Sequence, residues 1–187
     1  ILLSKLNTMN AQTRNYTMAK YKLVGENDPI LKQKCTEHII SEHTEQLAVD
    51  MINTMQEHGG IGLAAPQVGL AERVFVVGHE SQGFVVCINP IMKIAEDAEE
   101  ETYVEGCLTF PHLELKVKRQ NAVLLEYTNA QGVRKATKFV GVWAQAIQHE
   151  MDHLDGVLFQ DRVGATTLSL ANSKRREKAK RAARKKK

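Results

Sequence analysis

The sequence predicts an α+β domain, because two segments with helical periodicity enclose a run of segments with strand-like patterns. Apolar residues recur at helical spacing from Leu47 to Met55 and again from Val142 to Leu154. The segments between them are short, rich in β-branched residues or alternating in polarity, and separated by turn-forming residues. A length of 187 residues suits one domain with a core of useful size, and we see no internal repeat.

The first half of the chain is predicted to contain one helix, a glycine-rich loop and three strands. We expect the helix to have Ser41 or Thr44 as its N-cap and to stop at Gly59-Gly60. The loop GIGLAAPQVG follows directly at residues 60–69. The strand candidates are RVFVV, FVVCI and IMKIA, and Asn89-Pro90 is expected to close the second of them.

The second half is predicted to contain paired strands and a second helix. Acidic EDAEEE marks an exposed loop, and LELKVK and NAVLLEYT alternate like half-buried strands. The turn signal NAQG predicts that VRKATKFV pairs with the strand before it. The segment VWAQAIQHEMDHL carries an apolar stripe at helical spacing, and Gly156 is well placed to end this helix.

Composition and cysteine usage limit the class of protein. Hydrophobic residues make up 43% and charged residues 25% of the chain, which are globular values. No apolar run is long enough to span a bilayer, so we expect no membrane partner. The three cysteines, Cys35, Cys87 and Cys107, are odd in number and far apart, which favours a reducing compartment over a disulfide framework. We therefore expect a cytoplasmic protein, or one of an organelle matrix if residues 1–17 are the remnant of a transit peptide.

The two ends of the chain differ in charge from its middle. Residues 1–17 contain two basic residues and no acidic one, and we expect them to form a flexible leader. From Lys174 to Lys187 there are ten Lys or Arg and one Glu, a net charge of +9, while the other 173 residues carry 15 basic and 21 acidic side chains. The basic tail, predicted to span residues 166–187, is typical of an arm that binds a polyanion, and equally of a solvated helix end.

Two histidines and a glutamate on the second predicted helix indicate a metal site. His149 and His153 are four residues apart, so their rings project from one helix face and can bind the same ion. Glu150 lies beside the first histidine, where it can accept and return a proton without binding the metal. The same pattern also arises by chance on surface helices, so a third ligand is needed to support the site.

The third ligand is expected upstream of this helix. The only later glutamate is Glu177, inside the basic tail, and position 159, where a metzincin has histidine, is Phe159. The upstream candidates are His112 and the three cysteines. Cys107 follows a glycine and precedes a turn, a setting that can present a thiolate to a cleft, whereas Cys87 has the surroundings of a buried strand residue.

Three motifs resemble, in order and spacing, the signature motifs of the peptide deformylases. They are GIGLAAPQVG (60–69), EGCLTFP (105–111) and QHEMDHLDG (148–156). The similarity covers most of the chain and implies that residues 18–165 form a catalytic domain, with mostly antiparallel sheets packed around a central metal-binding helix. It further implies that Cys107, His149 and His153 hold the metal.

The resemblance also implies an activity and a set of catalytic groups. Peptide deformylases are metallohydrolases that remove the N-formyl group from the initiator methionine of nascent peptides and release formate. Glu150 would then serve as general base and acid. The formyl oxygen would be stabilised by the side-chain amide of Gln67 and by the backbone N–H of Leu108.

Substrate, metal and partner expectations follow from the same resemblance. Gly60, Ile61 and Gly62 are expected to bind the N-formylmethionyl peptide, with Gly62 offering backbone hydrogen bonds as to an added strand. Iron(II) is the expected metal, with zinc or nickel as alternatives. The basic tail resembles the helical extension of bacterial deformylases, which implies docking on the ribosome without sequence-specific nucleic-acid recognition.

Some residues depart from the family pattern. Thr109 stands where serine is common, but it keeps the hydroxyl group. Val104 stands where a second acidic residue is frequent, which predicts an altered pocket rim. Trp143 and Gln145 precede His149 on the metal helix, and they would change the side-chain preference of the pocket if they faced it.

Two other functions stay open at this point. Another HExxH metalloprotease would need a glutamate or histidine as its third ligand and would tolerate loss of Cys107. A ribosome- or nucleic-acid-binding module with a structural metal would keep its function when Glu150 is replaced.

Overall fold

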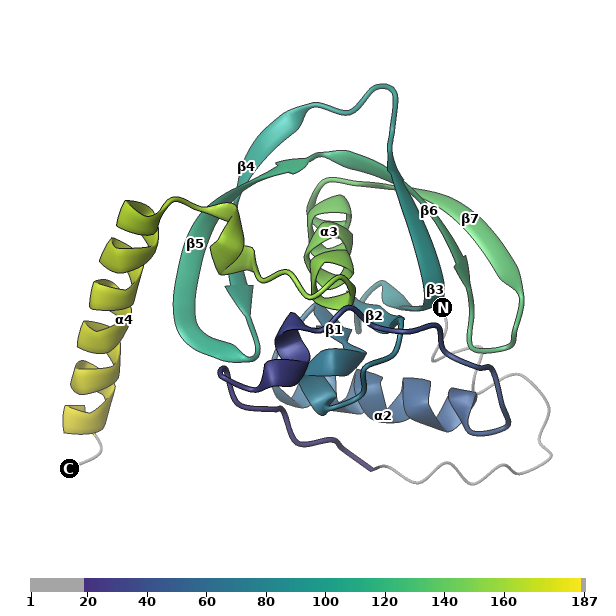
Figure 1. The fold of residues 1–187 in the computed structure, drawn as a ribbon, viewed down its shortest axis with the longest axis horizontal. Coiled ribbons are helices and arrows are strands. Elements are labelled where there is room, and N and C mark those ends of the chain that lie inside the picture. The colour runs from purple at the N-terminus through teal and green to yellow at the C-terminus, as the bar shows by residue number, and fades with distance from the viewer. Residues whose placement is uncertain (1–18, 186–187) are drawn as a thin grey trace.

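The computed structural model describes residues 19–185, and the side chains of residues 19–180. The leader predicted for residues 1–17 lies outside the described residues. Within them, a five-stranded antiparallel sheet in the order β1-β2-β3-β6-β7 and a two-stranded sheet, β4-β5, surround one helix, α3 (Figure 1). The elements, with η for 3-10 helices, are η1 (Pro29–Lys32), α2 (Thr44–Glu57), β1 (Gly62–Ala64), η2 (Ala65–Val68), β2 (Val74–His79), β3 (Gly83–Ile94), β4 (Glu100–Cys107), β5 (Phe110–Gln120), β6 (Ala122–Thr128), β7 (Arg134–Val140), α3 (Val142–Leu154), η3 (Phe159–Arg162) and α4 (Ala165–Lys185).

The five-stranded sheet is covered by a helix on each face. Along β2, Phe75 and Val77 pack in the cluster that contains α3, whereas Val74 and Val76 pack in the cluster that contains α2. Side chains alternate across a strand, so this strand is buried on both faces. Each such side chain contributes about 1.5–3 kcal/mol when it is fully buried. The central helix is therefore held at a defined height over the sheet.

A third cluster joins the β4-β5 arm to η1 on one side and to η3 and the start of α4 on the other. The inward side chains of β5 pack with η1, η3 and the first turns of α4; the cluster includes Leu31, Leu113, Leu115, Val117, Leu158 and Phe159, with Leu168 and Ala171 against it. Figure 1 shows α4 running along the outer side of β5, away from the five-stranded sheet. The start of the C-terminal helix is thus attached to the strand that follows the EGCLTFP turn.

The antiparallel strands around the central helix and the second predicted helix are confirmed. The helix α3 spans Val142–Leu154, and β6 pairs with β7 from Ala122↔Val140 to Thr128↔Arg134. Gly156 follows the helix in the left-handed region, at φ 72°. A Cβ there would lie 2.7 Å from the carbonyl oxygen of Lys32, so glycine is required both by its φ and by the close approach of η1.

The predicted end of a strand at Asn89-Pro90 is wrong. Strand β3 continues from Gly83 to Ile94, with an irregularity in its pairing to β6 between Ile88 and Ile91. Asn89 adopts a left-handed φ of 49°, and its side chain exchanges hydrogen bonds with the backbone N–H and C=O of His38. Turn-forming residues at this position produce a β-bulge inside the strand, where a proline without an N–H is tolerated.

The predicted N-cap of the first helix is also wrong. The N-cap of α2 is His43, which makes no side-chain capping bond, and Thr44 is the first helical residue. The hydroxyl group of Thr44 instead accepts from the backbone N–H of Ser41, at 2.9 Å. The hydroxyls of both candidate residues thus stabilise the turn before the helix, since Ser41 Oγ accepts from His43 N at 3.3 Å.

The acidic segment EDAEEE was predicted to be an exposed loop. The acidic loop is shorter than predicted, because Glu100 and Glu101 already pair with Gln120 and Arg119 in the β4-β5 sheet. Among the described helices, none combines the length and apolar character that crossing a bilayer requires.

Candidate metal centre

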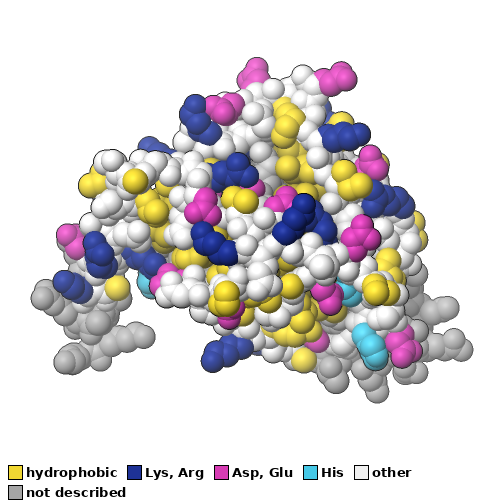
Figure 2. Space-filling view, in the orientation of Figure 1, with side chains coloured by type: hydrophobic (Ala, Val, Ile, Leu, Met, Phe, Trp, Pro, Cys, Tyr) yellow, Lys and Arg dark blue, Asp and Glu magenta, His cyan; other side chains and the backbone are white. Residues whose placement is uncertain are grey.

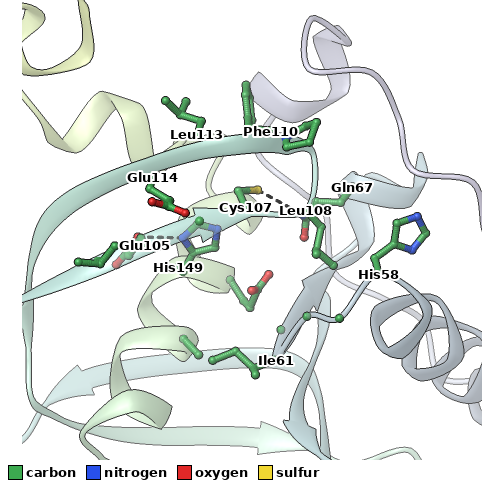
Figure 3. A pocket seen from close by; sticks show the side chains of 18 of the residues that line it. His58, Ile61, Gln67, Glu105, Cys107, Leu108, Phe110, Leu113, Glu114 and His149 are labelled. Carbon is green, nitrogen blue, oxygen red and sulfur yellow. Dashed lines mark hydrogen bonds and ion pairs between the residues drawn. The ribbon is translucent and has the colours of Figure 1, made fainter. Parts of the chain in front are cut away.

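Three potential metal ligands converge from two elements. His149 and His153 come from α3, and Cys107 is the last residue of β4. One donor atom from each of the three lies within 4.8 Å of the others. The sulfur of Cys107 is 3.4 Å from Nε2 of His153, and Figure 3 shows Cys107 beside His149 in the pocket. The structure thus brings together the three residues that the resemblance implied, while the alternative ligand, His112, lines the same pocket without joining the group.

These residues fit one divalent metal ion. A metal that binds sulfur and imidazole nitrogen at about 2.0–2.3 Å bridges donors up to about twice that distance apart. The nitrogen of His153 that faces the Cys107 sulfur is Nε2, while Nδ1 is buried without a hydrogen-bond partner among the described residues. Burial, together with the neighbouring His149 and Arg119, holds the pKa of His153 well below its usual range. The ring is therefore neutral, the form that can bind a metal.

Glu105 fixes the orientation of the first histidine. Nδ1 of His149 donates a hydrogen bond to Oε2 of Glu105 at 2.9 Å. This leaves Nε2, with its lone pair, as the metal-binding nitrogen. Burial alone would raise the pKa of Glu105, but hydrogen bonds from His149 and Arg119 outweigh burial and lower it to about 2. A permanently ionised carboxylate behind a histidine selects one tautomer and one ring orientation.

Glu150 lies at the centre without belonging to the ligand group. Its side chain is buried, Oε2 has no hydrogen-bond partner among the described residues, and burial raises its pKa to about 7. A Cβ at Gly62 would lie 2.3 Å from Oε1 of Glu150, so the edge strand must carry glycine where it passes the carboxylate. The carboxyl group is therefore held in place yet free to exchange a proton.

Gln67 and the turn after Cys107 complete the wall opposite α3. Oε1 of Gln67 accepts from the backbone N–H of Ala64 at 2.8 Å, so the amide nitrogen is directed toward Cys107 Sγ, at 3.3 Å, and Thr109 Oγ1, at 3.2 Å. The hydroxyl that Thr109 retains is thus the acceptor for this amide. Leu108 follows Cys107 in the two-residue turn between β4 and β5.

Two of the donors, Cys107 and His149, border a cavity of about 520 Å³ that is also lined by the predicted peptide-binding segment 60–62. Val104 and Gln145 line it, whereas the indole N–H of Trp143 donates to Oε1 of Gln82 at 3.1 Å. Sequence reasoning missed the lining residues His58 and Glu114 and the role of Glu105. The signal for Glu105 was available, because a metal-binding histidine usually donates its other nitrogen to a carboxylate.

Comparisons with known proteins identify the family to which the chain is similar. A family model described as polypeptide deformylase matches residues 20–168. The peptide deformylase of Desulforudis audaxviator is 41% identical over 152 residues, which are 81% of this chain and 97% of the relative. A crystal structure of a peptide deformylase from Synechococcus elongatus in complex with actinonin is 35% identical, with a TM-score of 0.77 over 89% of this chain and 94% of the other. A Met-Ala-Ser-bound crystal structure of a class I type b peptide deformylase from Acinetobacter baumannii is 31% identical. Its TM-score is 0.71, over 79% of this chain and 100% of the other.

Replacing the cysteine ligand tests the centre itself. We expect Cys107→Ser to weaken metal binding by more than the roughly 10–100-fold that follows loss of an outer partner, because a serine hydroxyl is a poor substitute for a thiolate. Metal content after equilibrium dialysis against a graded chelator measures the change. Cys35→Ser, at a buried thiol outside the group, is the matched control and should retain metal like the wild type. Equal retention in the Cys107 variant would contradict the assignment and point to another third ligand.

Proposed function

The chain belongs to the peptide deformylase family, and on that premise we propose which of its residues carry out the reaction. The protein is a metallohydrolase that removes the formyl group from N-formylmethionyl peptides and releases formate. The observation that carries the assignment is the convergence of Cys107 from β4 with two histidines of α3.

We assign the metal to Cys107, His149 and His153, and we propose iron(II) as the native ion. When bound, a divalent ion polarises the formyl carbonyl and lowers the pKa of the attacking water. Iron(II) is typical of the family that the motifs resemble, and zinc or nickel can occupy the same thiolate and imidazole donors. A thiolate-ligated ferrous site is expected to lose activity in air.

Glu150 is proposed as the residue that moves the proton. A carboxyl group with a pKa of about 7 is close to the optimum for both accepting and donating at neutral pH. Oε2 has no other partner among the described residues, so it is available to take a proton from water and to pass it to the departing amine.

Gln67 and Leu108 are proposed to stabilise the charge that develops on the formyl oxygen. The amide oxygen of Gln67 is held by the backbone N–H of Ala64, and its nitrogen faces Cys107 Sγ and Thr109 Oγ1 at the wall of the pocket, beside the proposed metal ligand. The tight turn at Leu108 places a backbone N–H next to the cysteine ligand. Donors fixed in this way need no reorganisation as the charge appears.

The peptide is proposed to bind along the start of β1 and the two residues before it, through Gly60, Ile61 and Gly62. Strand β1 is an edge strand, paired on one side with β2 in the register Gly62↔Val77. An edge strand offers unpaired backbone groups to which an extended peptide can add. The structure from Acinetobacter baumannii is described as Met-Ala-Ser bound, which supports a short peptide as the occupant of this pocket.

The basic C-terminal helix is proposed to dock on the ribosome. The helix α4 spans Ala165–Lys185, and Figure 2 shows several Lys and Arg side chains on its coloured part, whereas on the body basic and acidic side chains are interspersed. Contacts between basic side chains and RNA phosphates give affinity without sequence readout.

We also propose a reducing compartment, the cytoplasm, because Cys35, Cys87 and Cys107 are free thiols.

Replacing the proton carrier tests the catalytic assignment. We expect Glu150→Ala to keep its metal and to lose turnover by about 10²–10⁴-fold, the usual contribution of general acid–base catalysis. Formate release from formyl-Met-Ala-Ser by anaerobically prepared protein is the measurement, with the N-acetylated peptide as the substrate control. Asp155→Ala, a carboxylate that follows the same helix, should retain turnover. Turnover within a few-fold of wild type in the Glu150 variant would sink the assignment.

Reversing charge on the helix tests the proposed docking on the ribosome. We expect the triple variant Lys174→Glu, Arg176→Glu and Lys180→Glu to sediment less with ribosomes. Its log affinity should also fall less steeply with log salt, by about 0.7–0.9 in slope for each phosphate that the helix no longer neutralises. These three side chains are exposed on α4.

The matched control makes the same charge change elsewhere on the surface, in the variant Lys22→Glu, Lys93→Glu and Lys135→Glu, whose side chains are also exposed. Both variants should turn over a short formylated peptide like the wild type. An equal loss of co-sedimentation in the two, or none in the helix variant, refutes the docking proposal.

A further inference from the structure

A ladder of four charged side chains runs from the first histidine ligand to the surface. His149 donates to Glu105 at 2.9 Å, and Glu105 accepts from Nε and Nη2 of Arg119 at 2.7 and 3.0 Å. Nη1 of Arg119 donates to Oδ2 of Asp152 at 2.7 Å. The last member is Arg162 of η3, which donates from Nε to Oδ2 of Asp152 at 3.0 Å and from Nη2 to Oδ1.

Exposure rises along this ladder toward its outer end. The side chain of Glu105 is 0% exposed, that of Arg119 4%, that of Asp152 10% and that of Arg162 46%. The outer end lies at a separate cavity of about 240 Å³, bordered by Arg119, Asp152 and Arg162. Arg162 is therefore the most exposed member of the ladder, and it separates the buried members from solvent.

Arg162 also completes the charge balance of the ladder. Two carboxylates, Glu105 and Asp152, face two guanidinium groups. Without Arg162 the single guanidinium of Arg119 would serve two carboxylates that are almost fully buried, which is costly. The carboxylate of Asp152 would also lose the two-point interaction that fixes its plane, because both of its oxygens bind Arg162. Arg119, which Asp152 holds on one side, would then be free to turn away from Glu105.

We propose that Arg162 is a positioning residue for the metal centre, acting through Asp152, Arg119 and Glu105 on the ring of His149. It holds the plane of Asp152, which keeps Arg119 directed at Glu105, and Glu105 in turn fixes the imidazole. The inference rests on the metal site assigned under Proposed function.

The first test is metal retention in Arg162→Leu. Protein loaded with cobalt(II) is mixed with excess chelator, and the rate of metal loss is measured. We expect loss to be about 10-fold faster than in the wild type, the lower end of the effect of outer-shell partners. The visible absorption bands of bound cobalt should shift, because the geometry at His149 changes. The turnover number for formyl-Met-Ala-Ser should fall more than KM rises.

A matched control separates positioning from simple attachment of the helix. Arg73 also binds an aspartate at the end of α3, through a 2.7 Å hydrogen bond from Nη1 to Asp155, but this pair does not connect to Glu105. Arg73→Leu should leave cobalt release and the cobalt spectrum unchanged. If it accelerates release as much as Arg162→Leu does, Arg162 has only a structural role and the proposal fails.

A conservative variant keeps the test decisive if Arg162→Leu does not fold. Arg162→Lys restores the charge but provides one donor group instead of a two-point interaction, so its release rate should lie between those of the wild type and the leucine variant. If the leucine variant does not fold, and the lysine variant releases cobalt at the wild-type rate and has the wild-type spectrum, the proposal is overturned. A wild-type protein that binds no cobalt would instead overturn the assigned metal site, so the two failures are distinguishable.

Discussion

The guanidinium group of Arg119 holds together the two elements that carry the metal ligands. It binds Glu105, two residues before Cys107 on β4, and Asp152, which lies between His149 and His153 on α3. The strand with the thiol and the helix with the imidazoles are therefore joined by buried charge-assisted bonds next to the centre. Loss of one partner from such a pair costs about 3–5 kcal/mol, because it leaves a buried charge without compensation. This interaction therefore helps to fix the position of the sulfur relative to the two rings.

The rest of the fold delivers groups to the space that this interaction defines. The apolar clusters on the two faces of the sheet set the height of α3, and the edge strand β1 then passes directly beside Glu150. That passage is possible because residue 62 has no side chain, and the same argument applies to Gly60, where a Cβ would lie 2.7 Å from Cδ1 of Leu108. Burial of this carboxyl group explains its raised pKa.

Patterns local in the sequence predicted most of the fold and the ligands. Helical spacing located α3, and the resemblance of three motifs pointed to Cys107, His149 and His153, whose donor atoms lie together. Predictions from local patterns were wrong where a residue distant in the sequence binds the position. Asn89 reads as a turn residue, yet its side chain binds His38 and the strand continues. The ladder behind the centre was not predicted. Alternation along the strand places Arg119 on the inward face with Leu115 and Val117, but only the fold shows which carboxylates it meets there.

X-ray absorption at the metal edge tests the central claim most directly. For zinc-loaded protein, the account predicts one sulfur at about 2.3 Å and two imidazole nitrogens at about 2.0–2.1 Å, with any remaining ligand a light atom from solvent. The sulfur contribution should disappear when Cys107 is replaced and should persist when Glu150 is replaced. A wild-type spectrum without sulfur, or one in which the light-atom shell changes on loss of Glu150, would contradict the proposed arrangement of ligands and proton carrier.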